Sequence, residues 1–306
     1  MKEDPQDPRL LLGSCPDSWG VWFANDPLQT PWQRFLDEIS QVGYEWLELG
    51  PYGYLPTDPN QLSDELEKRR LKVAGGTMHG HSGLHRRADF KTIVDVTRKV
   101  SKLTSAVGAK HVIFVPVPGY RDDKSGAYLA PAELDDGQWD TMIRSTNELG
   151  KIIWEEHGVK LQFHPHADSH VETQKQTERF LQDTDSRYVS LCLDTGHLAY
   201  RRADVVSIIR NFPDRIGYVH IKQMDPRIIA IAEQDDLPFG KAVAMGASCE
   251  PPGGEPNLEE VTKALHELKA ELFVVVEQDM YPVDFDRPKA IAQRTRRVLH
   301  TCGIGR

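Results

Sequence analysis

The hydrophobic positions of the chain fall into short continuous runs, and longer stretches with helical periodicity separate these runs. The first three runs lie at residues 10–15, 46–50 and 72–77. Apolar runs of this length that are bounded by turn residues are typical of buried strands. Between them, apolar residues recur with the spacing of amphipathic helices at residues 31–42 and about 60–70. The N-terminal part is therefore predicted to alternate strand and helix.

The same alternation continues to the C-terminal end. A helix at about 90–107 precedes a strand at 111–116, and a strongly periodic helix at 139–157 precedes a strand that ends near His164. The remaining expected elements are strands ending near Asp194, Lys222 and Glu277 and helices at about 174–181, 204–211, 258–268 and 288–299. Eight strand–helix units follow one another with no linker or low-complexity tract, which predicts one domain over residues 1–306.

Two α/β architectures accommodate this alternation. A doubly wound sheet calls for a glycine-rich phosphate turn after its first strand, and the residues at 13–17 do not form one. Eight repeats favour the closed (β/α)8 TIM barrel. The connections after the first, fourth and seventh strands are long, and in such a barrel they would lie on the active face.

Composition and charge narrow the class of protein. The hydrophobic fraction of 39% is sufficient for a core, and the net charge of −9 argues against nucleic acid as the main partner. We find neither an apolar stretch of about 18 residues that could span a membrane nor a secretory signal at the start. The four cysteines are far apart, which indicates neither a disulfide framework nor a zinc ribbon. We expect a soluble, cytoplasmic protein; its oligomeric state, a homo-oligomer included, is left open.

Four strand ends carry side chains that can bind a metal: His164, Asp194, His220 and Glu277. The carboxyl ends of barrel strands meet at one mouth, so we expect these four groups to converge there. Taken singly, His164 could be a packed histidine and Asp194 a helix cap. Glu277, however, follows five apolar residues, and a buried carboxylate needs a partner or a metal. Together they predict a site for one divalent ion (Mn²⁺, Co²⁺, Fe²⁺, Zn²⁺ or Mg²⁺), with Ca²⁺ disfavoured by the imidazoles.

Proton transfer near this site could involve His166, His197, Glu48 and Lys222. The two histidines follow predicted metal ligands by two or three residues and should line the same pocket. Glu48 either enters the barrel as a base or faces the helices in a structural pair. Lys222 either reaches substrate oxygens or is a surface lysine.

Candidate substrate contacts are Trp19, Trp22, His79, His81 and Glu172. The two tryptophans could form a wall against a sugar ring or merely cover the end of the barrel. The two histidines follow the third strand, and each is either a substrate contact or a loop residue. Glu172 either contacts substrate or caps a helix.

Several short motifs carry a resemblance to a known family. They are Asp-Asp-Gly-Gln-Trp at 135–139, Val-Glu-Thr at 171–173, Asp-Thr-Gly-His at 194–197 and Val-His-Ile-Lys at 219–222. With them the chain resembles, over its whole length, the xylose isomerase-like TIM-barrel superfamily, which includes inosose dehydratases, ketose 3-epimerases, hydroxypyruvate isomerases and endonuclease IV. The pattern is most similar to the inosose (2-keto-myo-inositol) dehydratase branch.

This resemblance implies a metal held at the ends of strands five to eight, at the same four residues: His164, Asp194, His220 and Glu277. Most epimerases and isomerases of the superfamily have glutamate where this chain has His164, and that departure agrees better with the dehydratases. The implied reaction is metal-assisted enolisation of a keto-polyol or keto-sugar such as a keto-inositol.

The reaction outcome stays open between two classes. One side chain among His166, His197 and Glu48 would remove the proton next to the carbonyl, and a second group would act as acid. If a β-hydroxyl then leaves, the enzyme is a hydro-lyase, and the resemblance favours this outcome. If the proton returns to the other face or to the adjacent carbon, the enzyme is an epimerase or an isomerase. An apurinic-site endonuclease would need further histidines and a basic groove, and a metal-binding subunit active only with a partner is the remaining alternative.

Overall fold

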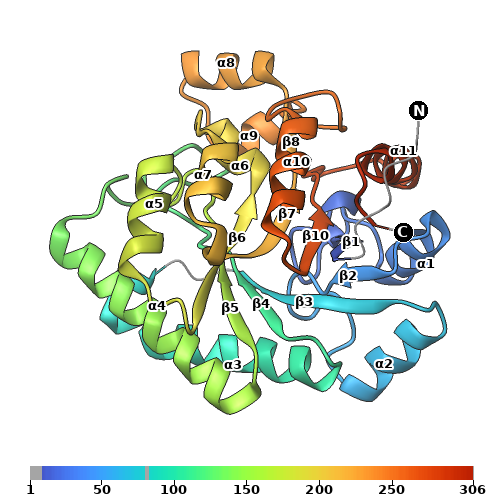
Figure 1. The fold of residues 1–306 in the computed structure, drawn as a ribbon, viewed down its shortest axis with the longest axis horizontal. Coiled ribbons are helices and arrows are strands. Elements are labelled where there is room, and N and C mark those ends of the chain that lie inside the picture. The colour runs from blue at the N-terminus through green and yellow to red at the C-terminus, as the bar shows by residue number, and fades with distance from the viewer. Residues whose placement is uncertain (1–8, 80–82, 306) are drawn as a thin grey trace.

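A computed structural model of the protein describes residues 9–79 and 83–305. Eight parallel strands close into a barrel in the order β1-β10-β7-β6-β5-β4-β3-β2 (Figure 1). Their bounds are β1 Leu10–Ser14, β2 Trp46–Glu48, β3 Lys72–Met78, β4 His111–Phe114, β5 Lys160–Phe163, β6 Val189–Asp194, β7 Ile216–Ile221 and β10 Leu272–Val276. The barrel closes where β1 pairs with β10 over the whole length of both strands. The predicted single-domain TIM barrel is confirmed.

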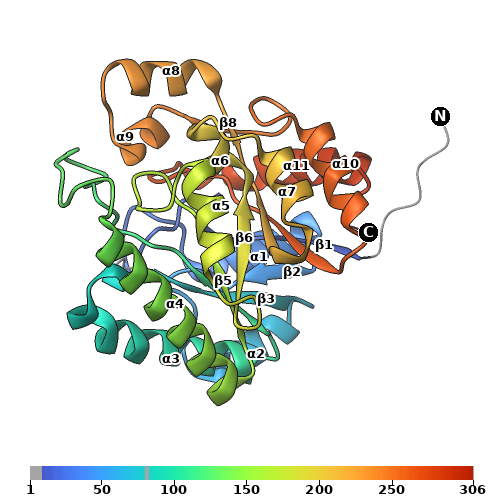
Figure 2. The ribbon, with the colours of Figure 1, turned by 60° about the vertical axis from the view of Figure 1, so that its left-hand side comes forward.

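Helices surround the barrel on all sides in the two ribbon views (Figures 1 and 2). Their bounds are α1 Trp32–Val42, α2 Pro59–Glu67, α3 Phe90–Ala106, α4 Asp136–His157, α5 Gln174–Asp183, α6 Thr195–Tyr200, α7 Val205–Asn211, α10 Leu258–Leu268 and α11 Pro288–Thr301. Helix α4 begins three residues before the predicted start, because the side chains of Asp135 and Gln138 form a capping box there. The other helices in this set agree with the sequence pattern within a few residues, except α6, which was not predicted as a separate helix.

The connection after β7 differs most from the sequence prediction. It was expected to be a long loop, but it folds into β8 (Gln223–Met224), α8 (Pro226–Gln234), α9 (Phe239–Ala244) and β9 (Ser248–Cys249). Strands β8 and β9 pair in an antiparallel ribbon, and Met224, Ile229 and Phe239 belong to a small apolar cluster of this part. Helix α8 has nine residues and α9 has six, and helices this short give little periodic signal.

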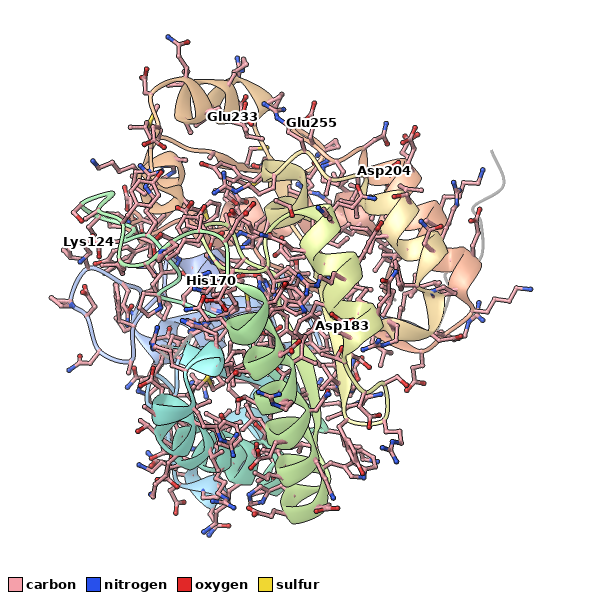
Figure 3. The ribbon with its side chains drawn as sticks, turned by 90° about the vertical axis from the view of Figure 1, so that its left-hand side faces the viewer. Lys124, His170, Asp183, Asp204, Glu233 and Glu255 are labelled. Atoms are coloured by element: carbon pink, nitrogen blue, oxygen red, sulfur yellow. The ribbon has the colours of Figure 1, made fainter. Side chains whose placement is uncertain are left out.

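Ion pairs fix this insertion over the barrel. The Arg202 guanidinium lies 2.9 Å from Glu233 on α8 and 3.7 Å from Glu255; both carboxylates lie near the top of the view in Figure 3. On another side, Arg121 pairs with Asp236 at 2.9 Å and ties the loop after β4 to the same insertion. Lys124 lies on that loop (Figure 3). Two long connections therefore meet over the carboxyl end of the barrel.

The main core lies between the strands and the surrounding helices. Phe163 on β5 stacks on Phe180 of α5 with ring centroids 4.0 Å apart, and Phe114 on β4 packs behind Phe163 at 6.0 Å. The Trp139 indole donates a hydrogen bond of 2.8 Å to Asp183 at the end of α5 (Figure 3). Among the described residues, no helix is long and apolar enough to cross a bilayer.

Replacing Phe180 with Ala should lower the free energy of unfolding by about 3–5 kcal/mol, because Phe180 is fully buried and its loss leaves a cavity against Phe163. Denaturant unfolding followed by circular dichroism would measure this change. Trp154→Ala is the control, since Trp154 on α4 is 47% exposed and should change stability by less than about 1 kcal/mol. Equal losses in the two variants would contradict the packing described above.

Candidate active site

The four predicted metal ligands come together at the carboxyl-terminal mouth of the barrel. His164 and Glu277 directly follow β5 and β10, Asp194 ends β6, and His220 is the penultimate residue of β7. One ligand atom from each lies within 4.8 Å of the others, and all four residues are buried. His164 Nε2 is 3.4 Å from Asp194 Oδ2 and 3.6 Å from Glu277 Oε2, and His220 Nδ1 is 3.7 Å from Asp194 Oδ2.

The hydrogen bonding of these atoms is consistent with a metal site. His164 Nε2, Asp194 Oδ2, His220 Nδ1 and Glu277 Oε2 are all buried and form no regular hydrogen bond in the part of the chain that the structure describes, although His220 Nδ1 and Glu277 Oε2 touch each other. Buried polar atoms are normally paired. Ligand atoms at about 2.1 Å from one metal ion lie roughly 3–3.5 Å from each other, and the three spacings given above are close to this range. The donor set therefore fits a single divalent cation.

The electrostatics of the cluster also favour a cation. Burial by itself would raise the pKa of the Asp194 carboxyl, but Lys222 and the nearby imidazoles hold that pKa well below its usual range. Burial likewise opposes the charged form of His220, yet the carboxylates around it raise its pKa well above the ordinary value. Two carboxylates thus draw positive charge into this place. A metal ion would supply that charge and release protons from the imidazoles.

The Glu48 side chain enters the barrel and does not face the surrounding helices, which were the two alternatives for its direction. Its Oε1 lies 2.6 Å from His220 Nε2, and its Oε2 accepts a hydrogen bond of 3.0 Å from the Thr77 hydroxyl. If His220 donates its Nε2 proton to Glu48, its Nδ1 lone pair faces the candidate metal position. Both carboxylate oxygens are engaged on the far side of the His220 ring, so this contact fits an orienting role better than that of a base.

Lys222 is almost fully buried, and the surface-lysine alternative is wrong. Its ammonium lies 2.7 Å from Asp279 Oδ2 and 3.4 Å from both Asp194 and Glu277. A Cβ at position 196 would lie 2.3 Å from Lys222 Cγ, so Gly196 gives the lysine stem the space it needs. The Asp-Thr-Gly-His turn therefore serves to admit a buried cation beside the ligands.

The two candidate histidines differ in what they can still do. Both ring nitrogens of His197 are engaged: Nδ1 accepts a hydrogen bond of 3.2 Å from the Ala167 amide, and Nε2 is 3.0 Å from Lys222 Nζ. Among the described residues, the His166 ring forms one hydrogen bond, which joins Nδ1 to the Ala167 carbonyl at 2.7 Å. A carbonyl oxygen only accepts, so Nδ1 carries the proton and His166 Nε2 keeps a lone pair. Burial lowers the pKa of His166 to about 3, which keeps the ring neutral.

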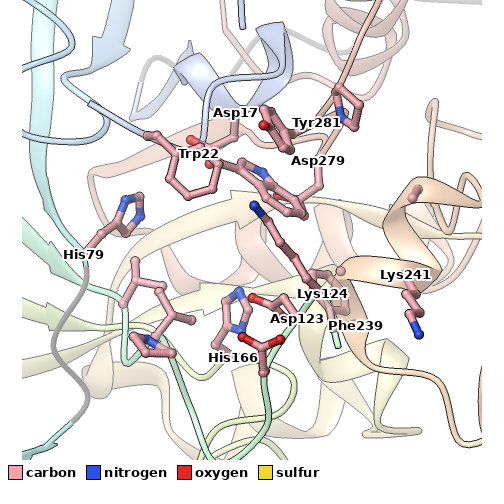
Figure 4. Close-up of a pocket in the computed structure, with 18 of the residues that line it drawn as sticks. Asp17, Trp22, His79, Asp123, Lys124, His166, Phe239, Lys241, Asp279 and Tyr281 are labelled. Atoms are coloured by element: carbon pink, nitrogen blue, oxygen red, sulfur yellow. The ribbon is translucent and has the colours of Figure 1, made fainter. Parts of the chain in front are cut away.

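A cavity of about 570 Å³ opens beside these groups, and its wall includes Trp22, His79, His166, Phe239 and Tyr281 (Figure 4). Trp22 donates a hydrogen bond of 3.3 Å to Asp279. Trp22 and His79 therefore lie where substrate contacts were predicted. His81 lies outside the described residues.

Two predicted substrate contacts are not on this wall. Trp19 is fully buried, donates a 2.9 Å hydrogen bond to Glu38 and packs edge-on against Phe35, so it belongs to the core beneath α1. Glu172 is held by Arg201 at 2.6 Å and by the Tyr120 hydroxyl at 2.8 Å. The N-cap of α5 is the neighbouring Thr173 and not Glu172. In the structure Glu172 therefore neither lines the cavity nor caps the helix, and instead it binds Arg201 and Tyr120.

Several wall residues were not singled out in the sequence, among them Asp17, Asp123, Lys124, Phe239, Tyr281 and Asp279. Asp279 had a signal, since it lies two residues beyond Glu277 on the same strand extension. Phe239 begins α9, in the connection after β7 whose helices the pattern did not reveal. The others come from loops, where periodicity carries no information about direction.

Comparison with known proteins agrees with this geometry. The family model described as "Xylose isomerase-like TIM barrel" matches residues 36–302. The chain belongs to this family. It is 30% identical to an inosose dehydratase of Bacillus velezensis over 281 residues, which cover 88% of this chain and 90% of the relative. An inosose dehydratase of Clostridium botulinum is 25% identical over 90% of this chain and 91% of its own.

Solved structures share the fold of this family member. A structure of L-ribulose 3-epimerase has a TM-score of 0.71 at 18% identity and covers 96% of this chain and 94% of its own. A structure of the IOLI protein with a bound zinc atom has a TM-score of 0.70 at 18% identity, covering 95% and 98%. At these identities the likeness establishes the architecture alone.

Replacing Asp123 with Asn should change how stability depends on pH. Asp123 accepts a hydrogen bond from the Gly240 amide, and burial, followed by the charge of Asp168, raises its pKa from 3.8 to about 6. The wild-type carboxyl is therefore most favourable to the fold below pH 3.8, and this contribution is lost as pH rises through about 6. Because Asn does not titrate, the Tm of the variant minus the Tm of the wild type should increase by roughly 2 °C or more when the pH is raised from 4.5 to 7.5. A Tm difference independent of pH would contradict this assignment.

Proposed function

We propose that this protein is a divalent-metal-dependent enzyme that enolises a keto-polyol or keto-sugar, and that it is a hydro-lyase resembling the inosose dehydratases. The observation that carries the proposal is the convergence of four buried donor atoms, one each from His164, Asp194, His220 and Glu277, within 4.8 Å of one another. They lie beside a cavity large enough for a sugar ring. When bound there, a divalent ion would polarise a carbonyl oxygen and acidify the adjacent carbon.

The surrounding residues support distinct roles in such a reaction. His166 Nε2 is the best-placed base for the proton next to the carbonyl, since its lone pair is free and its ring lines the cavity. The Lys222 ammonium is buried off the described cavity wall, where Asp279 holds it beside Asp194 and Glu277, so its role would be to balance and position these carboxylates. His197 supports His166 from behind, with ring centroids 3.9 Å apart. Glu48 orients His220.

The support for dehydration over isomerisation comes from sequence similarity to named relatives, and the geometry of the site adds nothing to it. The first half-reaction is the same in both, so the metal site does not choose between them. Relatives named inosose dehydratase align over most of this chain at 25–30% identity. The epimerase likeness rests on fold alone. An endonuclease finds less support, because β4 leads into Val115 and Val117, which line the cavity where further metal ligands would be needed.

The proposal is tested by loading the protein with Mn²⁺, Co²⁺, Zn²⁺ or Mg²⁺ and following keto-inositols and keto-sugars by NMR in deuterated water. We expect metal-dependent deuterium exchange at the carbon next to the ketone, accompanied by loss of water. Exchange without loss of water would favour the isomerase or epimerase alternative. Stoichiometric metal binding with no exchange in any substrate would count against enolisation.

The two neighbouring histidines should separate metal binding from catalysis. His164→Ala should lower metal occupancy at equal free-metal concentration, because it removes one of four ligands. His166→Ala should leave occupancy intact and slow exchange by about 10²–10⁴-fold, the usual contribution of a general base. Metal analysis and exchange rates on both variants decide this. Full occupancy in His164→Ala would remove that residue from the ligand set.

Glu48→Gln should weaken metal affinity by about 10–100-fold, the usual effect of losing a carboxylate that orients a metal-binding histidine. Gln keeps the size of the side chain but offers His220 a weaker acceptor. Competition with a metal-binding dye measures the affinity. Glu45→Gln serves as the control, since Glu45 pairs with Lys72 at the exposed opposite end of the strands. If saturating metal fails to restore exchange in Glu48→Gln, Glu48 has a role beyond orientation.

A further inference from the structure

We propose that the substrate is a keto-sugar or keto-cyclitol ring that carries a flat, apolar substituent, and that this substituent lies in the outer half of the cavity between Tyr281 and Phe239. The inference rests on the proposed function, because the ring bearing the ketone is placed against the candidate metal ligands. It goes further by specifying what is attached to that ring.

The size of the cavity is the first observation. At about 570 Å³ it lies within the range of pockets that hold drug-sized ligands, about 300–1,000 Å³. A bare six-membered keto-polyol would occupy roughly a third of this volume at the packing density of proteins. The remaining space needs either water or a further part of the ligand.

The chemistry of the wall is the second observation. Groups that suit a polyhydroxy ring gather at the inner end, where Glu277, Asp279 and His166 line the cavity. Apolar groups such as Pro282 and Ala244 also line the cavity, next to a few charged side chains. A sugar-like ring has hydroxyls around its whole edge, which apolar groups cannot satisfy. A wall that combines polar and apolar groups therefore matches a ligand with one polar and one apolar end.

The aromatic side chains form a surface suited to a flat group. Trp22 and Tyr281 stack with ring centroids 5.3 Å apart and planes 26° from parallel, and Phe23 meets Tyr281 edge-on at 5.3 Å. Phe239 faces them across the cavity (Figure 4). Phe23 remains 37% exposed although it lies on the wall. A flat apolar substituent in this gap would cover aromatic surface that is otherwise open to water.

The charges of the outer wall argue against a phosphate as the substituent. Lys124 and Lys241 are the cations of the described cavity wall, and Lys241 points away from its centre in Figure 4. Lys124 Nζ lies 5.6 Å above the Phe23 ring, and the carboxylates of Asp122 and Asp123 lie on the same wall. Phosphate binding would call for several converging donors without adjacent carboxylates. An uncharged apolar group is the better match.

The experiment compares substrates with and without the substituent on metal-loaded protein. We expect exchange next to the ketone to be at least tenfold faster, as kcat/KM, for phenyl 3-keto-β-D-glucoside than for 3-keto-D-glucose. Saturation-transfer NMR with phenyl and methyl β-D-glucoside, which carry no ketone, gives a second readout independent of turnover. We expect the phenyl protons to be saturated by the protein and the methyl glucoside to bind at least tenfold more weakly.

Tyr281→Ala should reduce the phenyl-to-unsubstituted ratio at least fivefold in both readouts. Tyr52→Ala is the matched control, because Tyr52 is similarly exposed, at 39%, but lies outside the cavity wall, and it should leave the ratio unchanged. Equal kcat/KM for the two keto-sugars, or a ratio insensitive to Tyr281→Ala, would overturn the inference and leave enolisation standing. Selective phenyl binding without any exchange would instead overturn the proposed function while supporting this cavity assignment.

Discussion

The structure of the mouth depends on placing two carboxylates, Asp194 and Glu277, side by side where water is excluded. Negative charge is unfavourable at such a place unless positive charge is supplied from close by. The chain supplies part of it through Lys222, whose ammonium lies 3.4 Å from each carboxylate. The carboxylates also raise the pKa values of the His164 and His220 imidazoles, so protons on these rings supply further positive charge. A divalent cation would take the place of those protons.

This constraint explains features that would otherwise look unrelated. Gly196 must lack a side chain because the stem of Lys222 passes against it. Asp194 uses its other oxygen to accept the His197 amide at 2.6 Å, which begins α6 and fixes the carboxylate in direction. Glu48 holds the far nitrogen of His220. Each contact leaves one donor atom directed at the same point, so the site is rigid before any ligand arrives.

The insertion after β7 and the loop after β4 turn this site into a cavity. Their apolar residues cover the open side of the barrel, and the Arg121–Asp236 pair joins them. A carbonyl bound beside the candidate ligands would be shielded from bulk water on that side, which strengthens electrostatic interactions there. The same connections also supply apolar wall groups such as Phe239 and Ala244, from which the substituent on the substrate is inferred.

The sequence by itself determined the barrel and the positions of the four candidate metal ligands. Strand periodicity and eight repeats left few topologies, and the parallel barrel brings every strand end to one mouth, so His164, Asp194, His220 and Glu277 could be found from their places in the strands. Only the tertiary structure decided where the side chains around these four residues point and what they contact. Glu48 and Lys222 face partners from other strands, Trp19 turns into the core, and Tyr281 and Phe239 meet across a gap between loops. Such contacts depend on side-chain direction and on irregular backbone, neither of which follows a periodic pattern along the chain.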